Sequence, residues 1–239
     1  MSGAMGRQWN IIAVIFYTNI AFYVLSILLN PQGIGISMNP MTFLSPSDSS
    51  LFILGATGSL PILVLQRWWT LISASFLHGS ILHIFFNMAA LRQLGPFVVR
   101  EFGVSRFIIL YILSGAFGFF LSALAGISFT IGASASLCGL IGAILYYGKS
   151  RGGYYGQAVY KQAMGWVMGL VIFGLFLPGI NNWAHGGGIA AGALTGFIIG
   201  YEEKRKTTYI LRILAAIFCV LTVLVLVWAV FQTFFTRLF

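Results

Sequence analysis

Seven apolar stretches follow one another along the chain, separated by short polar segments and by one long connection. They run over residues 11–29, 81–99, 107–125, 134–147, 163–177, 184–201 and 209–235. A helix needs about 20 predominantly apolar residues to cross a bilayer. The second stretch contains several polar residues and the fourth is short for a span, but both alternate with clear candidates. The pattern predicts seven membrane-spanning helices.

The composition supports the same conclusion. Hydrophobic residues make up 59% of the 239 residues and charged residues only 7%, whereas a soluble domain has roughly a quarter of its residues charged. The bilayer must therefore be the main solvent, and only helices or closed barrels satisfy their backbone groups there. We expect an all-α, polytopic helical bundle that forms a single transmembrane domain over residues 1–239.

The basic residues alternate between the connections. They are Arg7 before the first stretch, Arg100 and Arg106 after the second, Lys149, Arg151 and Lys161 after the fourth, and Lys204, Arg205, Lys206 and Arg212 after the sixth. Cytoplasmic loops are enriched in Lys and Arg, so the N-terminus is predicted inside and the C-terminus outside. The net charge of +9 is then explained by topology and contact with anionic lipid, and no nucleic-acid partner is expected.

The connection over residues 30–80 is rich in Pro, Gly and Ser but keeps apolar segments at 51–54 and 60–65. Loops of this length usually have a role of their own. A disordered segment should be more polar, so we expect this connection to lie on or partly in the outer leaflet. A flexible external loop is the alternative.

Polar residues at membrane depth are costly and are functional candidates by default. The predicted topology puts His78, His83, Asn87, Ser134 and His185 in the outer half of the membrane. Taken singly, each has an ordinary explanation: a helix cap for the serine, packing for a histidine, and helix association for the asparagine. Their convergence at one depth favours a functional site.

Two stripes of small residues give the fourth and sixth helices a reason to touch. The stripes consist of Ala135, Gly139 and Ala143, and of Gly188, Gly192, Gly196 and Gly200. Small residues at this spacing let helix backbones approach closely in membranes. If the two stripes face each other, Ser134 and His185 lie at the same level across the contact.

A serine beside a histidine can act as a nucleophile with a general base. The acidic residues are Asp48 in the long connection and Glu101, Glu202 and Glu203 on the predicted cytoplasmic side. A Ser-His dyad is therefore favoured over a triad. The candidate oxyanion donors are the side chains of Asn87 and His83 and the backbone N–H of Ser134. The two cysteines have no metal-ligand spacing, and we expect no cofactor and no metal.

At this point the chain resembles the rhomboid family of intramembrane serine proteases over residues 10–202. Gly132-Ala133-Ser134-Ala135 is similar to the family's G-x-S-G motif, and His78, His83 and Asn87 match its H-x4-H-x3-N signature. The segment that begins at Ala184-His185 and continues to Gly188 and Gly192 matches its general-base helix. The resemblance implies a six-helix core over residues 10–202 and an extra helix over 203–239.

The resemblance also implies a function. Ser134 would attack the scissile carbonyl to form an acyl-enzyme, His185 would be general base and then general acid, and His78, Gly132, Gly188 and Gly192 would support the site. Substrates would be single-span membrane proteins with helix-destabilising or small residues near the cleavage point, entering past the fifth helix. Apart from the resemblance, a first helix that we expect to be retained, with no recognisable targeting peptide, suits a bacterial inner membrane.

Two departures from the family pattern affect these expectations. Ala135 replaces the second glycine of the nucleophile motif, and we expect its methyl group to be tolerated. Asn182 stands where some members have Asp, outside the dyad. A catalytically inactive relative that binds transmembrane clients is the main alternative. A transporter is disfavoured, because no acidic residue lies in any predicted span.

Overall fold

The computed structural model describes residues 2–36, 38–39, 42–177 and 179–235, and helices dominate these ranges. The long helices are α1 (Ser2–Leu29), α4 (Ile81–Phe102), α5 (Val104–Leu124), α6 (Ser134–Arg151), α7 (Gly153–Phe176), α8 (Asn182–Ile199) and α9 (Tyr209–Phe235). Each overlaps one of the predicted apolar stretches, so the all-α, polytopic helical fold is confirmed. Pro178 of the predicted connection 178–183 and the side chain of Arg7 lie outside the described part.

Several helices extend beyond the apolar stretches that predicted them. Arg100, Lys149, Arg151 and Lys161 lie inside α4, α6 and α7, so their expected position in connecting loops is wrong. Hydropathy marks where a helix crosses lipid, whereas a helix can continue through polar residues of good helix propensity. Two of the four cations are in the last turn of α6, where the helix dipole stabilises positive charge.

Five helices of the described chain are long and apolar enough to cross a membrane: α1 from Ile11, α4, α5, α7 and α9. α6 and α8 are not among them. α6 is buried along most of its length, and α8 buries one face against α5 and α6. Shielding by neighbouring helices lowers the cost of the polar residues that these two helices carry.

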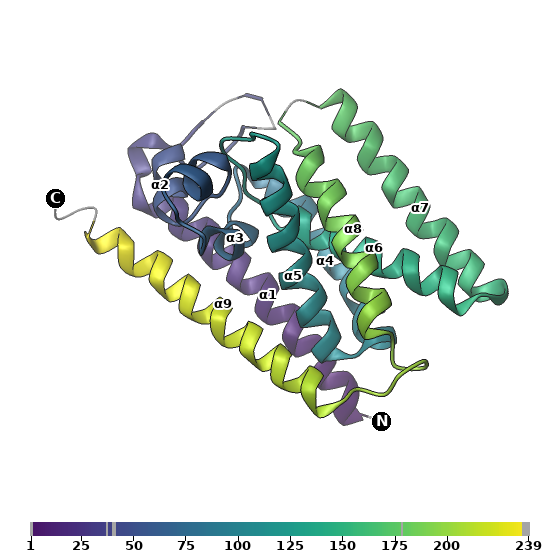
Figure 1. Ribbon diagram of the computed structural model, residues 1–239. Coiled ribbons are helices and arrows are strands. Elements are labelled where there is room, and N and C mark those ends of the chain that lie inside the picture. Colours follow the sequence, from purple (N-terminus) through teal and green to yellow (C-terminus); the bar gives the residue numbers. More distant parts are fainter. Residues whose placement is uncertain (1, 37, 40–41, 178, 236–239) are drawn as a thin grey trace.

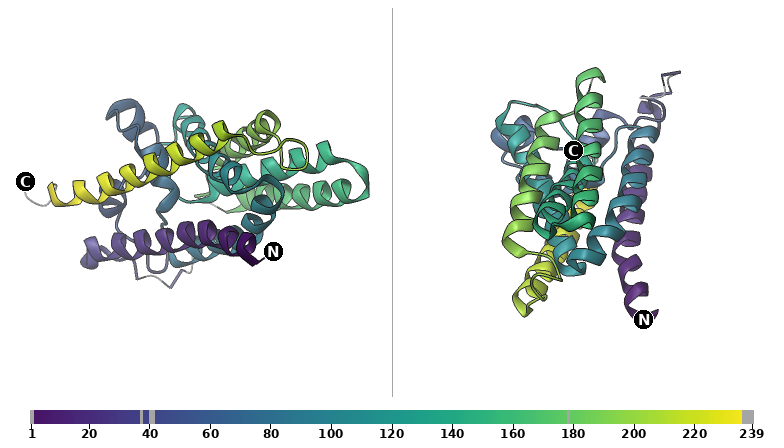
Figure 2. Two further views of the ribbon diagram at one scale, coloured as in Figure 1. Left: turned by 90° about the horizontal axis from the view of Figure 1, so that it is seen from below. Right: turned by 90° about the vertical axis from the view of Figure 1, so that its right-hand side faces the viewer.

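The helices are arranged around α5 and α6. α8 packs on both of them, α9 packs along α5, and α1 packs along α4. The two ends of the chain lie at opposite ends of the long helices (Figure 1), and Figure 2 shows α1 and α9 on opposite faces of the bundle. α7 lies at the outer edge beside α6. Which end faces the cytoplasm stays a prediction.

The long connection is folded rather than floppy in its described residues. It contains η1 (Pro31–Gly33), α2 (Asp48–Ile53), η2 (Leu60–Val64), α3 (Thr70–Ser73) and η3 (Ala74–Phe76). Leu51, Leu54 and Ile62 are buried, while Leu63 and Val64 point outward. Arg67 holds the connection together by stacking on aromatic rings of its two halves. The exposed apolar side chains fit the predicted position at the outer leaflet, which stays a prediction.

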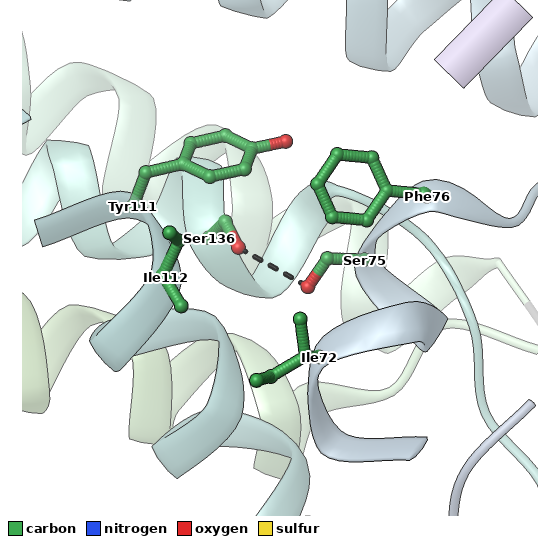
Figure 3. A pocket seen from close by; sticks show the side chains of 6 residues that line it. All are labelled: Ile72, Ser75, Phe76, Tyr111, Ile112 and Ser136. Carbon is green, nitrogen blue, oxygen red and sulfur yellow. Dashed lines mark hydrogen bonds between the residues drawn. The ribbon is translucent and has the colours of Figure 1, made fainter. Parts of the chain in front are cut away.

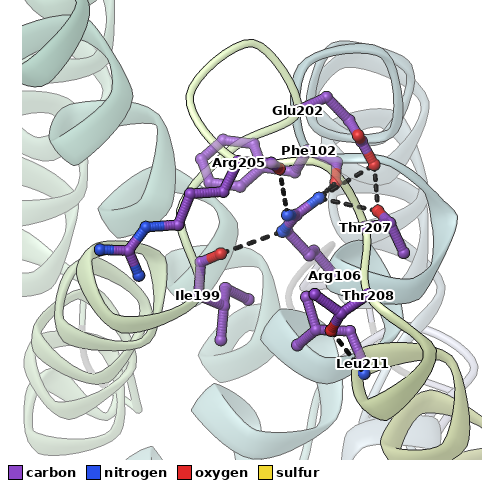
Figure 4. Close-up of polar contacts among 8 residues, drawn as sticks. All are labelled: Phe102, Arg106, Ile199, Glu202, Arg205, Thr207, Thr208 and Leu211. Carbon is purple, nitrogen blue, oxygen red and sulfur yellow. Dashed lines mark hydrogen bonds and ion pairs between the residues drawn. The ribbon is translucent and has the colours of Figure 1, made fainter.

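At the end of the bundle opposite the long connection, charged residues link the turns α4–α5, α6–α7 and α8–α9. Arg106, expected in a loop, is instead fully buried in the first turn of α5. Its guanidinium donates hydrogen bonds to the Glu202 carboxylate at 2.9 Å, to the Thr207 hydroxyl at 2.8 Å and to three backbone carbonyls (Figure 4). The five-donor fork of arginine suits such a site. Arg151 pairs with Glu203 at 2.9 Å beside it.

Replacing Arg106 with leucine should destabilise the fold. The change leaves the carbonyls of Phe102 and Ile199 without their donor, and buried groups left unpaired are costly. Glu202 keeps 38% of its side chain exposed, so water replaces part of the lost interaction. We expect the free energy of unfolding to fall by about 2–3 kcal/mol. The measurement is the unfolding midpoint in detergent. Lys206→Leu is the control, because it removes an exposed cation from the connection that contains Glu202. It should shift the unfolding midpoint little, and a shift equal to that of Arg106→Leu would contradict the prediction.

Candidate active site

Ser134 is the first residue of α6, and the residues before it shape the turn. Gly132 adopts φ +121°, a conformation that only glycine adopts readily. Its N–H donates to the Ala74 carbonyl at 2.9 Å. Ala133 occupies the N-cap position, and no side chain caps this helix end. Ser134 is therefore not the cap, and the ordinary explanation of this serine does not apply.

The hydroxyl of Ser134 contacts the imidazole of His185. The distance between Ser134 Oγ and His185 Nε2 is 2.9 Å, within hydrogen-bond range. His185 lies in the first turn of α8, and both residues keep part of their surface accessible. The structure thus brings together the two residues that the sequence singled out, from positions 51 apart in the chain.

The small-residue stripes of α6 and α8 face each other as expected. A Cβ at Gly192 would overlap the backbone of Gly139, and one at Gly188 would overlap the carbonyl of Ala135. The two backbones are therefore in direct contact, and no larger residue fits at either position. This close approach lets a short serine side chain reach the histidine of the neighbouring helix.

The methyl group of Ala135 is accommodated by the residues that pack around it. It is fully buried in a small cluster with Ala74, Phe119 and Ala184. Gly118 of α5 stands opposite: a Cβ there would come within 3.3 Å of the Ala135 Cβ. The structure accommodates alanine at this position because α5 supplies the glycine. The expected tolerance in activity stays a prediction.

His83 borders the space in front of Ser134. Its Nδ1 accepts a hydrogen bond from the Gly79 N–H at 3.3 Å, so a neutral ring carries its proton on Nε2. The Cβ that Gly132 lacks would lie 2.6 Å from His83 Nε2 and 3.6 Å from Ser134 Oγ. Because residue 132 has no side chain, the His83 imidazole can pack directly against the backbone two residues before Ser134.

The other predicted site residues, Asn87 and His78, both contact His83. Asn87 is buried one turn along α4, and its Nδ2 donates to the His83 carbonyl at 3.0 Å. One N–H of that amide remains for another acceptor. His78 is fully buried and packs edge-on against His83, with ring centroids 5.0 Å apart.

The carboxylates of the described chain lie elsewhere. Glu101, Glu202 and Glu203 form ion pairs at the opposite end of α4, α6 and α8, and Asp48 begins α2. Among the described residues, Nδ1 of His185 has no hydrogen-bond partner. The arrangement around Ser134 is thus a pair of residues without a third, acidic member.

A small hollow, too narrow to admit a water molecule, lies between α3, η3, α5 and α6 (Figure 3). Ser75 and Ser136 share a hydrogen bond of 3.3 Å at its wall, and Tyr111 points its hydroxyl into it. Ser134 is not among the lining residues, so this hollow is separate from the space in front of the serine hydroxyl. The sequence analysis did not single out these hydroxyls, which look like ordinary small helix residues in the sequence.

Asn181 is a second feature that sequence reasoning missed. Its side chain accepts a hydrogen bond from the Ala184 N–H at 3.0 Å and caps α8. An Asn directly before a helical stretch is a known cap signal, so the sequence could have shown it. Asn182, which the sequence analysis did note, points the other way and donates to the Gly174 carbonyl of α7 at 2.9 Å.

Comparisons with known proteins show which sequences this chain is similar to. A family model described as "Rhomboid domain" matches residues 65–202. "RHOMBOID-like protein 4" of Arabidopsis thaliana is 34% identical over 67% of this chain and 41% of its own length, and "RHOMBOID-like protein 6, mitochondrial" of the same plant is 33% identical over 70% and 57%. "Rhomboid protease GluP" of Bacillus subtilis is 28% identical over 63% and 31%. The chain spans about half the length of the curated relatives it matches.

Proposed function

The chain belongs to the rhomboid family, and from this premise we propose that it is an intramembrane serine endopeptidase with Ser134 and His185 as its catalytic pair. It is a multi-pass integral membrane protein of a family that carries out intramembrane proteolysis. The observation that carries the proposal is the 2.9 Å contact between Ser134 Oγ and His185 Nε2.

The geometry supports acyl transfer in two steps. His185 Nε2 takes the hydroxyl proton as Ser134 Oγ attacks the scissile carbonyl carbon, and the carbonyl oxygen becomes an oxyanion. His185 then gives the proton to the leaving amine, and the C–N bond breaks to leave an acyl-serine. A water molecule, deprotonated by the same Nε2, attacks the ester and releases the carboxyl product and Ser134.

The proposed oxyanion site lies beside Ser134 Oγ. His83 Nε2 packs against Gly132 close to this oxygen, and the N–H of Ser134 stands at the positive end of the α6 dipole. Asn87 contributes its remaining amide N–H, or holds His83 through the carbonyl that it contacts. His78 supports His83 from behind.

Substrates are proposed to be single-span membrane proteins with helix-destabilising or small residues near the cleavage point, cut near the outer leaflet. Substrates are proposed to enter at α7. Only 11% of the residues in the 18-residue apolar segment of this helix are buried, and few long helices besides α6 pack against it. Its start and end are attached to α6 and α8. The six-helix core over residues 10–202 with one further helix remains the proposed organisation. A bacterial plasma membrane stays a prediction, since the relatives include mitochondrial and chloroplastic plant proteins.

The alternative is an inactive family member that binds transmembrane clients. Reaction with a fluorophosphonate separates the two, because the probe bonds only to a serine whose proton a base removes. We expect the reconstituted chain to be labelled and mass spectrometry to place the label on Ser134. A folded chain without label would contradict the proposal.

Ser136→Ala is the matched control for the labelling. Ser136 lies on the same helix two residues further, and its hydroxyl is buried against Ser75. The variant should be labelled as fast as the unmodified chain. Loss of label in this variant would show that the probe reports helix packing rather than an activated Ser134.

A further inference from the structure

Asn181 contacts three separate parts of the fold at the entrance of α8. Its carbonyl accepts from the His185 N–H at 3.1 Å, and its Oδ1 accepts from the Ala184 N–H at 3.0 Å. Its Nδ2 donates to Ser122 Oγ at 2.6 Å and to Thr130 Oγ1 at 2.9 Å. An ordinary helix cap requires only the Oδ1 bond, so the two side-chain bonds of Nδ2 need another explanation.

Thr130 lies four residues before Ser134, in the segment that leads into α6. This segment is itself fixed: the backbones of Thr57 and Thr130 exchange two hydrogen bonds, of 3.0 and 2.7 Å. Thr57 also accepts a hydrogen bond from the buried Thr70 hydroxyl at 3.0 Å. The Thr130 hydroxyl is therefore a firm point of attachment, because the long connection holds its backbone in place.

Ser122 provides the second point of attachment. It is fully buried near the C-terminal end of α5, the helix that packs against both α6 and α8. Through Ser122 and Thr130, the Asn181 amide thus joins the start of α8 to the end of α5 and to the segment before α6.

The contact between α6 and α8 creates a need for such a link. Glycine faces bring the two backbones together, but Gly139 and Gly192 have no side chains that interlock against sliding along the helix axes. A shift of about 1 Å between reacting groups can lower a rate about 100-fold. The distance from Ser134 Oγ to His185 Nε2 therefore depends on something that fixes the axial position of α8.

We propose that Asn181 is a positioning residue that fixes His185 relative to Ser134 by joining α8 to Thr130 and Ser122. The proposal rests on the proposed protease function. Asn181 does not touch the reacting atoms, so it acts through the placement of the base. Its loss should slow the chemical step and leave substrate binding unchanged.

Asn181→Ser is the direct test. Serine is an equally good N-cap but is too short to reach both Thr130 and Ser122, so α8 keeps its cap and loses the link. In a reconstituted cleavage assay on a single-span substrate we expect kcat to fall about 10- to 100-fold, with KM within about twofold. An unchanged kcat in a folded Asn181→Ser variant would overturn the proposal.

Thr130 allows the same link to be tested from its other end. Thr130→Val keeps the shape and removes one of the two acceptors, so kcat should fall, but less than in Asn181→Ser, because the bond to Ser122 remains. Thr130→Ser keeps the hydroxyl and should restore kcat to within about threefold of the unmodified chain, an outcome that a purely structural role of the methyl group would not give. A Thr130→Ser variant as slow as Thr130→Val would overturn the proposal.

Asn30→Ser is the matched control, since it makes the same change at another cap, where the Asn30 Nδ2 donates to the Ser47 hydroxyl at 3.3 Å in the long connection. We expect its kcat to stay near that of the unmodified chain, and an equal loss in both variants would overturn the positioning role. An unmodified chain that neither cleaves substrate nor reacts with a fluorophosphonate would overturn the proposed function and this proposal with it. An active chain whose Asn181→Ser variant is equally fast would overturn the positioning role alone.

Discussion

Replacing Ser134 with alanine is expected to lower the rate of substrate cleavage by about 10⁴-fold or more. Alanine keeps the helix start and removes the one oxygen that contacts His185 Nε2, so no acyl-enzyme can form. The measurement is single-turnover cleavage of a reconstituted single-span substrate. Substrate binding, measured by crosslinking, should be unchanged, because the lost atom acts on the reacting carbonyl.

His185→Gln should cause a loss of similar size, and the double variant should be no slower than either single one. Residues that act as one unit in catalysis are strongly non-additive. Both variants should keep the unfolding midpoint of the unmodified chain within a few degrees. Residual cleavage by Ser134→Ala at more than about a hundredth of the normal rate would mean that another group is the nucleophile.

The second large effect is expected at His83. His83→Leu removes the N–H that borders the space beside Ser134 Oγ, and loss of one oxyanion donor typically lowers kcat about 10²- to 10³-fold. The KM should change little, because the charge that this donor stabilises develops only in the transition state. The steady-state kinetics of the reconstituted variant measure both quantities.

Phe85→Leu serves as the control for His83→Leu. Phe85 is two residues further along α4 and 61% exposed on the outer surface of the bundle, so its replacement tests whether any change in this turn slows the reaction. We expect nearly normal kcat. If His83→Leu raised KM and left kcat intact, the imidazole would be a binding group for the substrate rather than an oxyanion donor.

Much of the fold follows from the sequence because lipid imposes a simple rule on helices. The apolar stretch 209–235 has the same bounds as α9, and 107–125 lies within three residues of the bounds of α5. The stretch 11–29 ends with α1, which begins earlier, at Ser2. Helix ends near the charged side were misjudged, as with Lys161 in α7, because a helix can continue through polar residues after the hydropathy has fallen. Arg106 shows the opposite case, in which a cation beside an apolar stretch is buried by partners distant in sequence.

The contact between Ser134 and His185 was predictable because three independent patterns agreed: loop charge, small-residue spacing and motif order. The internal structure of the long connection was not, since its elements are short and are held by tertiary contacts such as Arg67 over Phe52. The link through Asn181 to Thr130 was equally hidden, because it joins loops about 50 residues apart and no periodicity records such a contact. The catalytic roles of these residues remain predictions.

The low apolar content of α6 and α8 has a consequence for biogenesis. A nascent segment enters the bilayer on its own only when its apolar residues outweigh its polar ones, and α6 and α8 are not among the helices that meet this condition by length and composition. They need neighbouring helices as partners for insertion. Ser134 is synthesised 51 residues before His185, so an incompletely translated chain that ends in α7 holds a serine without its base. The proposed catalytic pair can therefore form only after α8 has been synthesised and has packed against α6.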